Sequence, residues 1–214
     1  MRLFVAVTFS DEVKDSLAIL ARELERQASA GRFVPRENFH LTLAFLGTTE
    51  RFAELEEMLR HTARLELAEP LELCLEGIGS FKAGRKSSRA RDGRAADASA
   101  RRGGMTGGKT GEGRAGEGKA RDFANGTGYT WWVGVAENPG LLRLAGVLSR
   151  ALREAGFSRE RRSFKPHVTL GRAVVTRKPV ELILPELSVE VHSLSLMKSD
   201  LSAALPVYTE IFRT

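Results

Sequence analysis

The sequence predicts an α+β fold made of two similar lobes that face each other across a cleft. The main observation is a repeat, because an apolar strand, an amphipathic helix and a strand beginning His-x-Thr-Leu occur twice in the same order. A second observation is a segment rich in glycine and arginine, 82–128, that lies between the two copies. Two copies are too few to stack into a solenoid, so the repeat favours a pair of facing lobes.

The first copy begins with an apolar strand at 3–9 and a helix for which Ser10 is the expected N-cap. An apolar stripe at helical spacing indicates the buried face of this helix. The stripe consists of Val13, Leu17, Leu20 and Leu24. A strand at 40–47, a second amphipathic helix at 52–65 and a strand at 71–78 complete this half of the chain.

The second copy begins with a strand at 129–136, directly after the glycine-rich segment. Pro139 is expected at the start of the helix that follows and Gly156 at its end, where these two residue types are favoured. A strand at 164–173 then carries the second His-x-Thr motif. Two further stretches are typical of strands, at 188–199 and 207–213.

Segment 82–128 contains no Leu, Ile or Val and holds twelve of the 21 glycines. Such a segment cannot bury enough apolar area to offset the entropy lost on ordering, so we expect a disordered insertion in a single two-lobed domain, 1–214. Its twelve Lys/Arg against five Asp/Glu account for the whole net charge of +6. The insertion either adds salt-sensitive attraction to RNA or is a tolerated expansion of a surface loop, and the second interpretation is favoured.

The insertion also contains "GGMTGGKT" at 103–110, which matches the Walker A pattern. A phosphate-binding loop of that kind needs a buried strand before it and a helix after it. Neither flanking stretch can form those elements, so we do not expect a nucleotide site here.

The composition argues against a membrane-spanning protein and against a disulfide-stabilised protein. No run of about 18 apolar residues occurs, so we expect no transmembrane helix and no membrane partner. The N-terminus is typical of a first strand rather than a signal peptide, which makes the cytoplasm the expected compartment. The single cysteine, Cys74, excludes an intramolecular disulfide and is expected to be a small buried residue.

The chain has four histidines, and two of them stand out. His61 is expected on the surface of a helix, and His192 on a strand, without a function. His40 and His167 each open a strand as His-x-Thr-Leu, after a helix. One such pattern arises easily by chance, but two at matching places in a repeat indicate a shared site.

These residue types suit acid–base chemistry at phosphorus. Imidazole exchanges protons near neutral pH, and on a strand the hydroxyls of Thr42 and Thr169 lie on the same face as the rings of His40 and His167. Two such pairs facing each other would place two proton-transfer groups and two hydroxyl donors around one anion. Arg172 follows closely enough to neutralise its charge. The alternative, polar residues on two solvated strand faces, is disfavoured by the repeat.

The stretches "RFVPRENFHLTLAFLG" and "RRSFKPHVTLGRA" resemble the two signature stretches of the 2H phosphoesterases. The branch that they resemble most is the bacterial and archaeal RNA 2′,3′-cyclic phosphodiesterases, also known for 2′–5′ RNA ligase activity. The opening "RLFVAVTFSDEVKDSL" and the ending "LMKSDLSAALPVYTEI" are similar to that branch as well. The resemblance implies two pseudo-symmetric lobes, each with an antiparallel sheet and flanking helices around a central cleft.

The resemblance also implies an activity, namely opening of a 2′,3′-cyclic phosphate to a 2′-phosphomonoester, without a metal or other cofactor. By position, His40 corresponds to the proton donor and His167 to the proton acceptor, while Thr42 and Thr169 correspond to phosphate-binding hydroxyls. The residues by themselves are symmetric and do not assign these two roles. Arg172 is a further candidate for substrate binding.

The expected partner is RNA with 2′,3′-cyclic phosphate ends, tRNA halves among them, bound by a monomer. Two alternatives remain open at this point. One is a 2H hydrolase acting on a small substrate, such as a cyclic nucleotide or an ADP-ribose cyclic phosphate. The other is a module that binds RNA ends without turnover, for which two matched proton-transfer groups would not be needed.

Overall fold

A computed structural model describes residues 2–82, 128–157, 163–200 and 206–214. The Walker-A-like stretch and all but the two ends of the predicted insertion lie outside these residues. Among the described residues, no helix has both the length and the apolar character needed to cross a bilayer.

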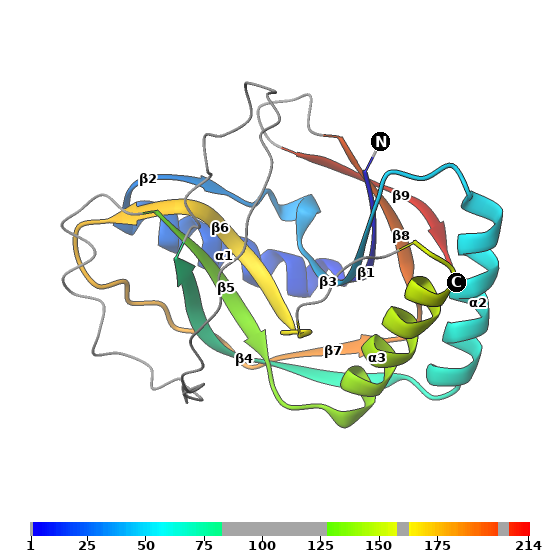
Figure 1. Ribbon diagram of the computed structural model, residues 1–214. Coiled ribbons are helices and arrows are strands. Elements are labelled where there is room, and N and C mark those ends of the chain that lie inside the picture. Colours follow the sequence, from blue (N-terminus) through cyan, green and yellow to red (C-terminus); the bar gives the residue numbers. More distant parts are fainter. Residues whose placement is uncertain (1, 83–127, 158–162, 201–205) are drawn as a thin grey trace, which may run out of the picture.

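The first of two antiparallel sheets has four strands in the order β3-β1-β8-β9. Strands β1 (Arg2–Thr8) and β3 (His40–Gly47) come from the first predicted copy. Strands β8 (Ser195–Asp200) and β9 (Val207–Arg213) come from the C-terminal end of the chain. This sheet therefore joins the two ends of the sequence (Figure 1).

The second sheet has five strands in the order β2-β6-β5-β4-β7, again antiparallel throughout. Its strands are β2 (Ala28–Phe33), β4 (Leu71–Lys82), β5 (Tyr129–Val135), β6 (His167–Thr176) and β7 (Leu187–Val191). Without its edge strand β2, the order β6-β5-β4-β7 matches the order β3-β1-β8-β9 of the first sheet. The α+β fold with two pseudo-symmetric lobes is confirmed.

Each His-x-Thr strand pairs with the strand that begins its own copy of the repeat. His40 on β3 lies opposite Thr8 on β1, and His167 on β6 lies opposite Gly134 on β5. Along both pairs the register shifts twice at matching places, after the His-x-Thr motif and again a few residues later. The two copies thus share fine structure as well as strand order.

The insertion lies between the two copies in sequence but does not connect the two lobes. Strands β4 and β5, which flank it, are neighbours in one sheet, and Lys82 lies opposite Tyr129. The insertion therefore joins the two strands of a β-hairpin. Each sheet also takes strands from both halves of the chain, because β8 and β9 return to β1 and so complete the first sheet.

The described residues form three α-helices: α1 (Asp11–Gln27), α2 (Phe52–Glu66) and α3 (Pro139–Glu154). Helices α1 and α2 lead from the first sheet to the second, whereas α3 joins β5 to β6 within the second sheet. The Ser10 side chain accepts the backbone N–H of Val13, which confirms the predicted cap. All four residues of the predicted apolar stripe of α1 are buried. Helix α3 begins with a proline and is followed by Gly156 at φ +76°, as predicted.

One hydrophobic core joins the two sheets and includes residues from all three helices. Helix α1 packs against β2 and β6 of the second sheet, while α3 packs against α2 and against β3 of the first. Each helix of the repeat therefore packs against the His-x-Thr strand of the other copy, which fixes one such strand relative to the other.

Three local predictions need correction. The stretch 188–199 forms two strands in different sheets, β7 and β8, rather than one. The edge strand β2 and the 3-10 turn at Arg36–Asn38 lack a regular apolar pattern and had no sequence signal. Cys74 is exposed, because β4 alternates at this point and buries Leu73 and Leu75 on its opposite face.

Candidate active site

His40 is held by hydrogen bonds at both ring nitrogens. Its Nδ1 lies 2.7 Å from the carbonyl oxygen of Asn38, and its Nε2 lies 3.0 Å from Oγ1 of Thr42. A carbonyl oxygen can only accept, so Nδ1 carries the proton, and in the neutral ring Nε2 accepts the hydroxyl hydrogen of Thr42. Asn38 is itself anchored, since its side-chain amide donates to the carbonyl of Pro206 over 2.7 Å.

Two aromatic rings enclose the His40 ring. The ring centroid of Phe4 lies 4.9 Å from that of His40, and the centroid of Tyr208 lies 5.2 Å away in an edge-on arrangement. Burial disfavours the charged imidazolium and lowers the pKa of His40 from 6.5 to about 4. Smaller effects are included in this value, since the Asn38 carbonyl opposes the lowering of the pKa and electrostatic interaction with Arg172 and His167 adds to it. In the free protein His40 is therefore neutral at pH 7.

His167 is oriented in the same way at one nitrogen. Its Nδ1 lies 2.7 Å from the carbonyl oxygen of Lys165, two residues earlier, just as Asn38 precedes His40 by two residues. Nδ1 is again the protonated nitrogen, which leaves Nε2 for proton exchange. Phe81 and Trp132 flank the ring, with centroids at 5.5 and 6.2 Å.

Arg172 contacts the second threonine of the repeat. Its Nη2 lies 3.4 Å from Oγ1 of Thr169, to which it donates a long hydrogen bond. In a regular strand Arg172 would share the core-facing side with Val168 and Leu170, but it is exposed because it lies within the second register shift against β5, between Gly171 and Val174. Ala173, the next residue, has a positive φ of 52°, which marks the same irregularity.

The structure brings the predicted residues of the two copies together. Strands β3 and β6 contact each other although they belong to different sheets, at the centre of Figure 1. Electrostatic interaction with Arg172 and His167 on β6 contributes to the lowered pKa of His40 on β3, so these three residues lie near one another. The threonines complete the group, since Thr42 contacts His40 and Thr169 contacts Arg172.

The other two histidines lie elsewhere. His61 is exposed on α2, as predicted. His192 lies in the connection between β7 and β8 rather than on a strand, where its Nε2 is 3.0 Å from a carboxylate oxygen of Glu190. Neither contacts His40 or His167.

Sequence reasoning missed the residues that support the two rings. Asn38 could have been found, because it stands at the same distance before His40 as Lys165 stands before His167. The rings of Phe4 and Tyr208 carry no such signal, since only the order of strands in the first sheet brings them to His40. The same holds for Phe81 and Trp132 beside His167.

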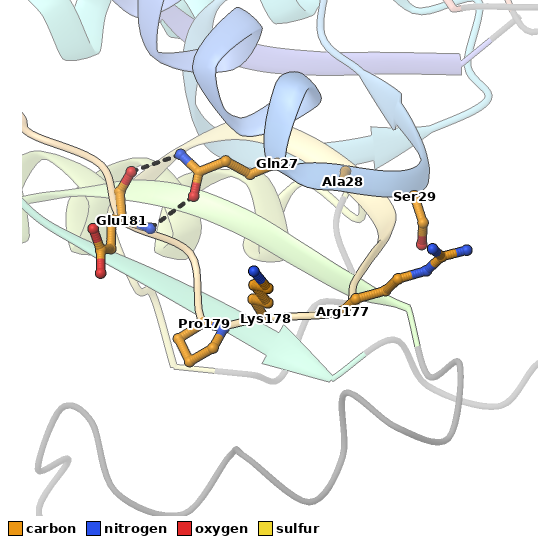
Figure 2. Close-up of a pocket in the computed structure, with 7 residues that line it drawn as sticks. All are labelled: Gln27, Ala28, Ser29, Arg177, Lys178, Pro179 and Glu181. Atoms are coloured by element: carbon orange, nitrogen blue, oxygen red, sulfur yellow. Dashed lines mark hydrogen bonds between the residues drawn. The ribbon is translucent and has the colours of Figure 1, made fainter.

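A cavity of about 630 Å³ lies away from these residues, where β6 ends and the chain turns back toward α1 (Figure 2). Its walls include Gln27, Ser29, Arg177 and Lys178. The Gln27 amide donates to the carbonyl of Glu181 and accepts its backbone N–H, at 2.7 and 2.9 Å. None of the five predicted site residues lines this cavity, so it is a separate surface hollow. In the described ranges no cluster of three or more potential metal ligands occurs.

The two lobes with one His-x-Thr strand each define a class of protein, the 2H phosphoesterases. A family model described as "LigT like Phosphoesterase" matches residues 7–90 and 133–208. The chain therefore belongs to the LigT-like phosphoesterase family.

Curated relatives cover nearly the whole chain. A protein of Aeropyrum pernix named RNA 2′,3′-cyclic phosphodiesterase is 38% identical over 207 residues, which is 90% of this chain and 92% of the relative. A Thermus thermophilus protein of the same name is 30% identical over 220 residues, 98% of this chain and 87% of the relative.

Solved structures share the fold. The crystal structure of TT0787 from Thermus thermophilus has a TM-score of 0.63 and 26% identity, and covers 100% of this chain and 96% of that one. Apo LigT of E. coli has a TM-score of 0.63 with 23% identity, covers 100% of this chain and 95% of that one, and supports the fold alone.

Proposed function

We propose that this protein is an RNA 2′,3′-cyclic phosphodiesterase that converts a terminal cyclic phosphate to a 2′-phosphomonoester. The observation that carries the proposal is the pair of matched histidines, each with Nδ1 committed to a backbone carbonyl two residues earlier. This arrangement leaves Nε2 of His40 and of His167 for proton transfer. The names of the relatives at 25–38% identity support the substrate class.

In the proposed reaction His40 is the proton donor and His167 the proton acceptor. Nε2 of His167 takes a proton from water as the water oxygen attacks phosphorus. The bond from phosphorus to the 3′-oxygen breaks, and His40 delivers its proton to that oxygen, leaving the phosphate on the 2′-oxygen. Each general acid or base contributes roughly 10²–10⁴-fold to the rate.

The remaining site residues hold the phosphate. The hydroxyls of Thr42 and Thr169 donate to the non-bridging oxygens, and the guanidinium of Arg172 neutralises the charge that develops on them. The long contact between Arg172 and Thr169, 3.4 Å, is readily exchanged for shorter contacts to an anion.

The donor role requires that substrate change the protonation of His40. With a pKa of about 4 the ring is neutral in the free protein, but a bound phosphate anion favours the imidazolium and raises that pKa. Binding would also displace the Thr42 hydroxyl from Nε2, so that the protonated ring can reach the leaving oxygen. If the roles are exchanged, neutral His40 would instead be the base, and a bell-shaped pH profile is expected for either assignment.

The reverse 2′–5′ ligase activity follows from the same chemistry. A 5′-hydroxyl of a second RNA takes the place of water, and its oxygen attacks the cyclic phosphate while the 3′-oxygen leaves. The product carries a 2′–5′ linkage, and no further residue is needed.

The test is incubation of the purified protein with an oligoribonucleotide ending in a 2′,3′-cyclic phosphate, in the presence of EDTA. We expect a 2′-phosphomonoester and a bell-shaped pH profile of kcat/KM. Cyclic ends that persist would overturn the activity, a requirement for added metal would overturn the two-histidine mechanism, and a 3′-phosphate product would contradict the direction of opening. A profile that is flat from pH 5 to pH 9 would argue against both histidine roles.

A further inference from the structure

A second arginine, Arg32, lies directly opposite Arg172 on the neighbouring strand β2. The register pairs Arg32 with Arg172 and the next residue, Phe33, with Gly171. Directly opposed residues on antiparallel strands point to the same face, with their Cα atoms about 5 Å apart. Because Arg172 contacts Thr169 on the face of the site, Arg32 lies on that face too, while Phe33 packs against the core on the other face.

This pair of like charges has no counter-charge in the part of the chain that the structure describes. Both side chains are exposed, and no described carboxylate forms an ion pair with either guanidinium. Some other described arginines do have such partners, as in the ion pairs of Arg36, Arg51, Arg143 and Arg213. Like charges directly opposite each other on a sheet are unfavourable, so an unneutralised arginine pair beside a phosphate site points to an anionic ligand.

The position of Arg32 indicates which anion it takes. Arg172 is assigned above to the reacting cyclic phosphate, and β2 is the edge strand of the second sheet, so Arg32 lies one strand farther out. The terminal nucleotide of an RNA carries a second phosphate, the 5′-phosphodiester that links it to the rest of the chain. Paired strands lie about 5 Å apart. An arginine side chain is long enough to span this distance and reach a phosphate one nucleotide away.

We propose that Arg32 binds the 5′-phosphodiester of the terminal nucleotide and so selects RNA ends over cyclic mononucleotides. This inference rests on the proposed function and names its specificity determinant. A cyclic mononucleotide without a 5′-phosphate offers Arg32 no partner, whereas every RNA end does. Phosphate contacts of this kind position a nucleic acid without reading its sequence, so the preference is independent of the base.

The kinetic test compares a dinucleotide ending in a 2′,3′-cyclic phosphate with the corresponding cyclic mononucleotide. The measured quantity is the ratio of kcat/KM for the two substrates, in the wild type and in Arg32→Gln. We expect the substitution to lower this ratio about tenfold, and to make the slope of log kcat/KM against log salt for the dinucleotide shallower by ~0.7. Arg64→Gln is the matched control and keeps the wild-type ratio, because Arg64 is an exposed arginine on α2, a helix at the right edge of Figure 1 that lies apart from β2.

A binding measurement separates this inference from the proposed function. Adenosine 2′-phosphate and adenosine 2′,5′-bisphosphate differ only in the 5′-phosphate, and their Kd values are measured by calorimetry in both proteins. We expect the 5′-phosphate to lower the Kd for the wild type. The fold decrease in Kd for Arg32→Gln should be less than a third of the decrease for the wild type. An equal gain in both proteins, or no gain in the wild type, would overturn the role of Arg32 whether or not turnover is seen. Persistence of both cyclic substrates with the wild type would instead overturn the proposed function.

Discussion

The two His-x-Thr strands share a pattern and a pair of bulges, yet they surround their histidines differently. On β3 the ring of His40 lies between Phe4 and Tyr208, and its Nε2 is bonded to Thr42. On β6 the corresponding threonine contacts Arg172 instead of the histidine. Five residues after each histidine the matching bulges expose a side chain, which is Phe45 on β3 and Arg172 on β6.

This difference shows how one repeated strand can provide two chemical environments. Aromatic rings flank both histidines, and in the copy with Phe45 the burial of His40 lowers its pKa to about 4. The copy with Arg172 provides the positive charge that an anionic substrate needs. The shared backbone therefore fixes where side chains lie, and the residue type at the exposed position decides whether that place is apolar, as with Phe45, or charged, as with Arg172.

The largest expected effect comes from removing either histidine. His40→Ala and His167→Ala should each lower kcat on a cyclic-phosphate RNA by about 10²–10⁴-fold, because each removes one proton-transfer group. The double variant should lose little more than the worse single variant, since the two groups act in one step. Single-turnover assays on folded variants measure this. If the loss of kcat in the double variant equalled the product of the two single losses, the histidines would act independently, which would contradict a shared step.

The second largest effect is expected at Arg172, which occupies on β6 the position that Phe45 occupies on β3. Arg172→Gln should lower kcat/KM about 10–100-fold, which corresponds to the loss of a charge-assisted hydrogen bond to phosphate. The same substitution should raise the pKa of His40, because a nearby positive charge is lost. NMR titration of the His40 ring measures that pKa. Phe45→Gln is the matched variant in the other copy and should change kcat/KM much less. Equal losses would show that the two bulges do not differ in function.

A smaller effect concerns stability in acid. The unfolded chain protonates His40 as the pH falls through about 6.5, whereas the folded protein resists protonation until about pH 4. The contribution of neutral His40 to stability is therefore complete above pH 6.5 and is lost toward pH 4, by at most about 3 kcal/mol. Urea unfolding at both pH values should show a weaker pH dependence in His40→Gln than in the wild type. The same pH dependence in both proteins would contradict the burial of this ring.

The smallest expected effect concerns the segment between β4 and β5. Lys82 and Tyr129 are direct cross-strand neighbours, so an Asn-Gly turn in place of residues 83–128 can close the hairpin. We expect the shortened protein to fold with an unchanged Tm within a few degrees and to keep its kcat/KM on a cyclic mononucleotide. Circular dichroism and the mononucleotide assay measure these quantities. Loss of the folded state would show that the segment is structural.

The site was more accessible to sequence reasoning than its surroundings were. His40, His167, Thr42 and Thr169 were predicted from the repeat and Arg172 from its position three residues after Thr169, and their shared role in a site stays a prediction. The rings that lower the pKa of His40 were not identified, because Tyr208 reaches it only through the pairing of β1 with β8 and of β8 with β9. Arg32 was missed for a similar reason, since β2 has no regular apolar pattern and pairs with a strand far along the chain.

By itself the sequence determined most of the helices and strands, the repeat and the residue types of the predicted site. These depend on short-range periodicity and capping, which act over a few residues and can be read from the chain directly. Only the tertiary structure decided that β8 and β9 complete the first sheet, that β4 and β5 form one hairpin, and that the two histidines differ in environment. Strand order and register depend on contacts between residues far apart in sequence, and no local pattern encodes them.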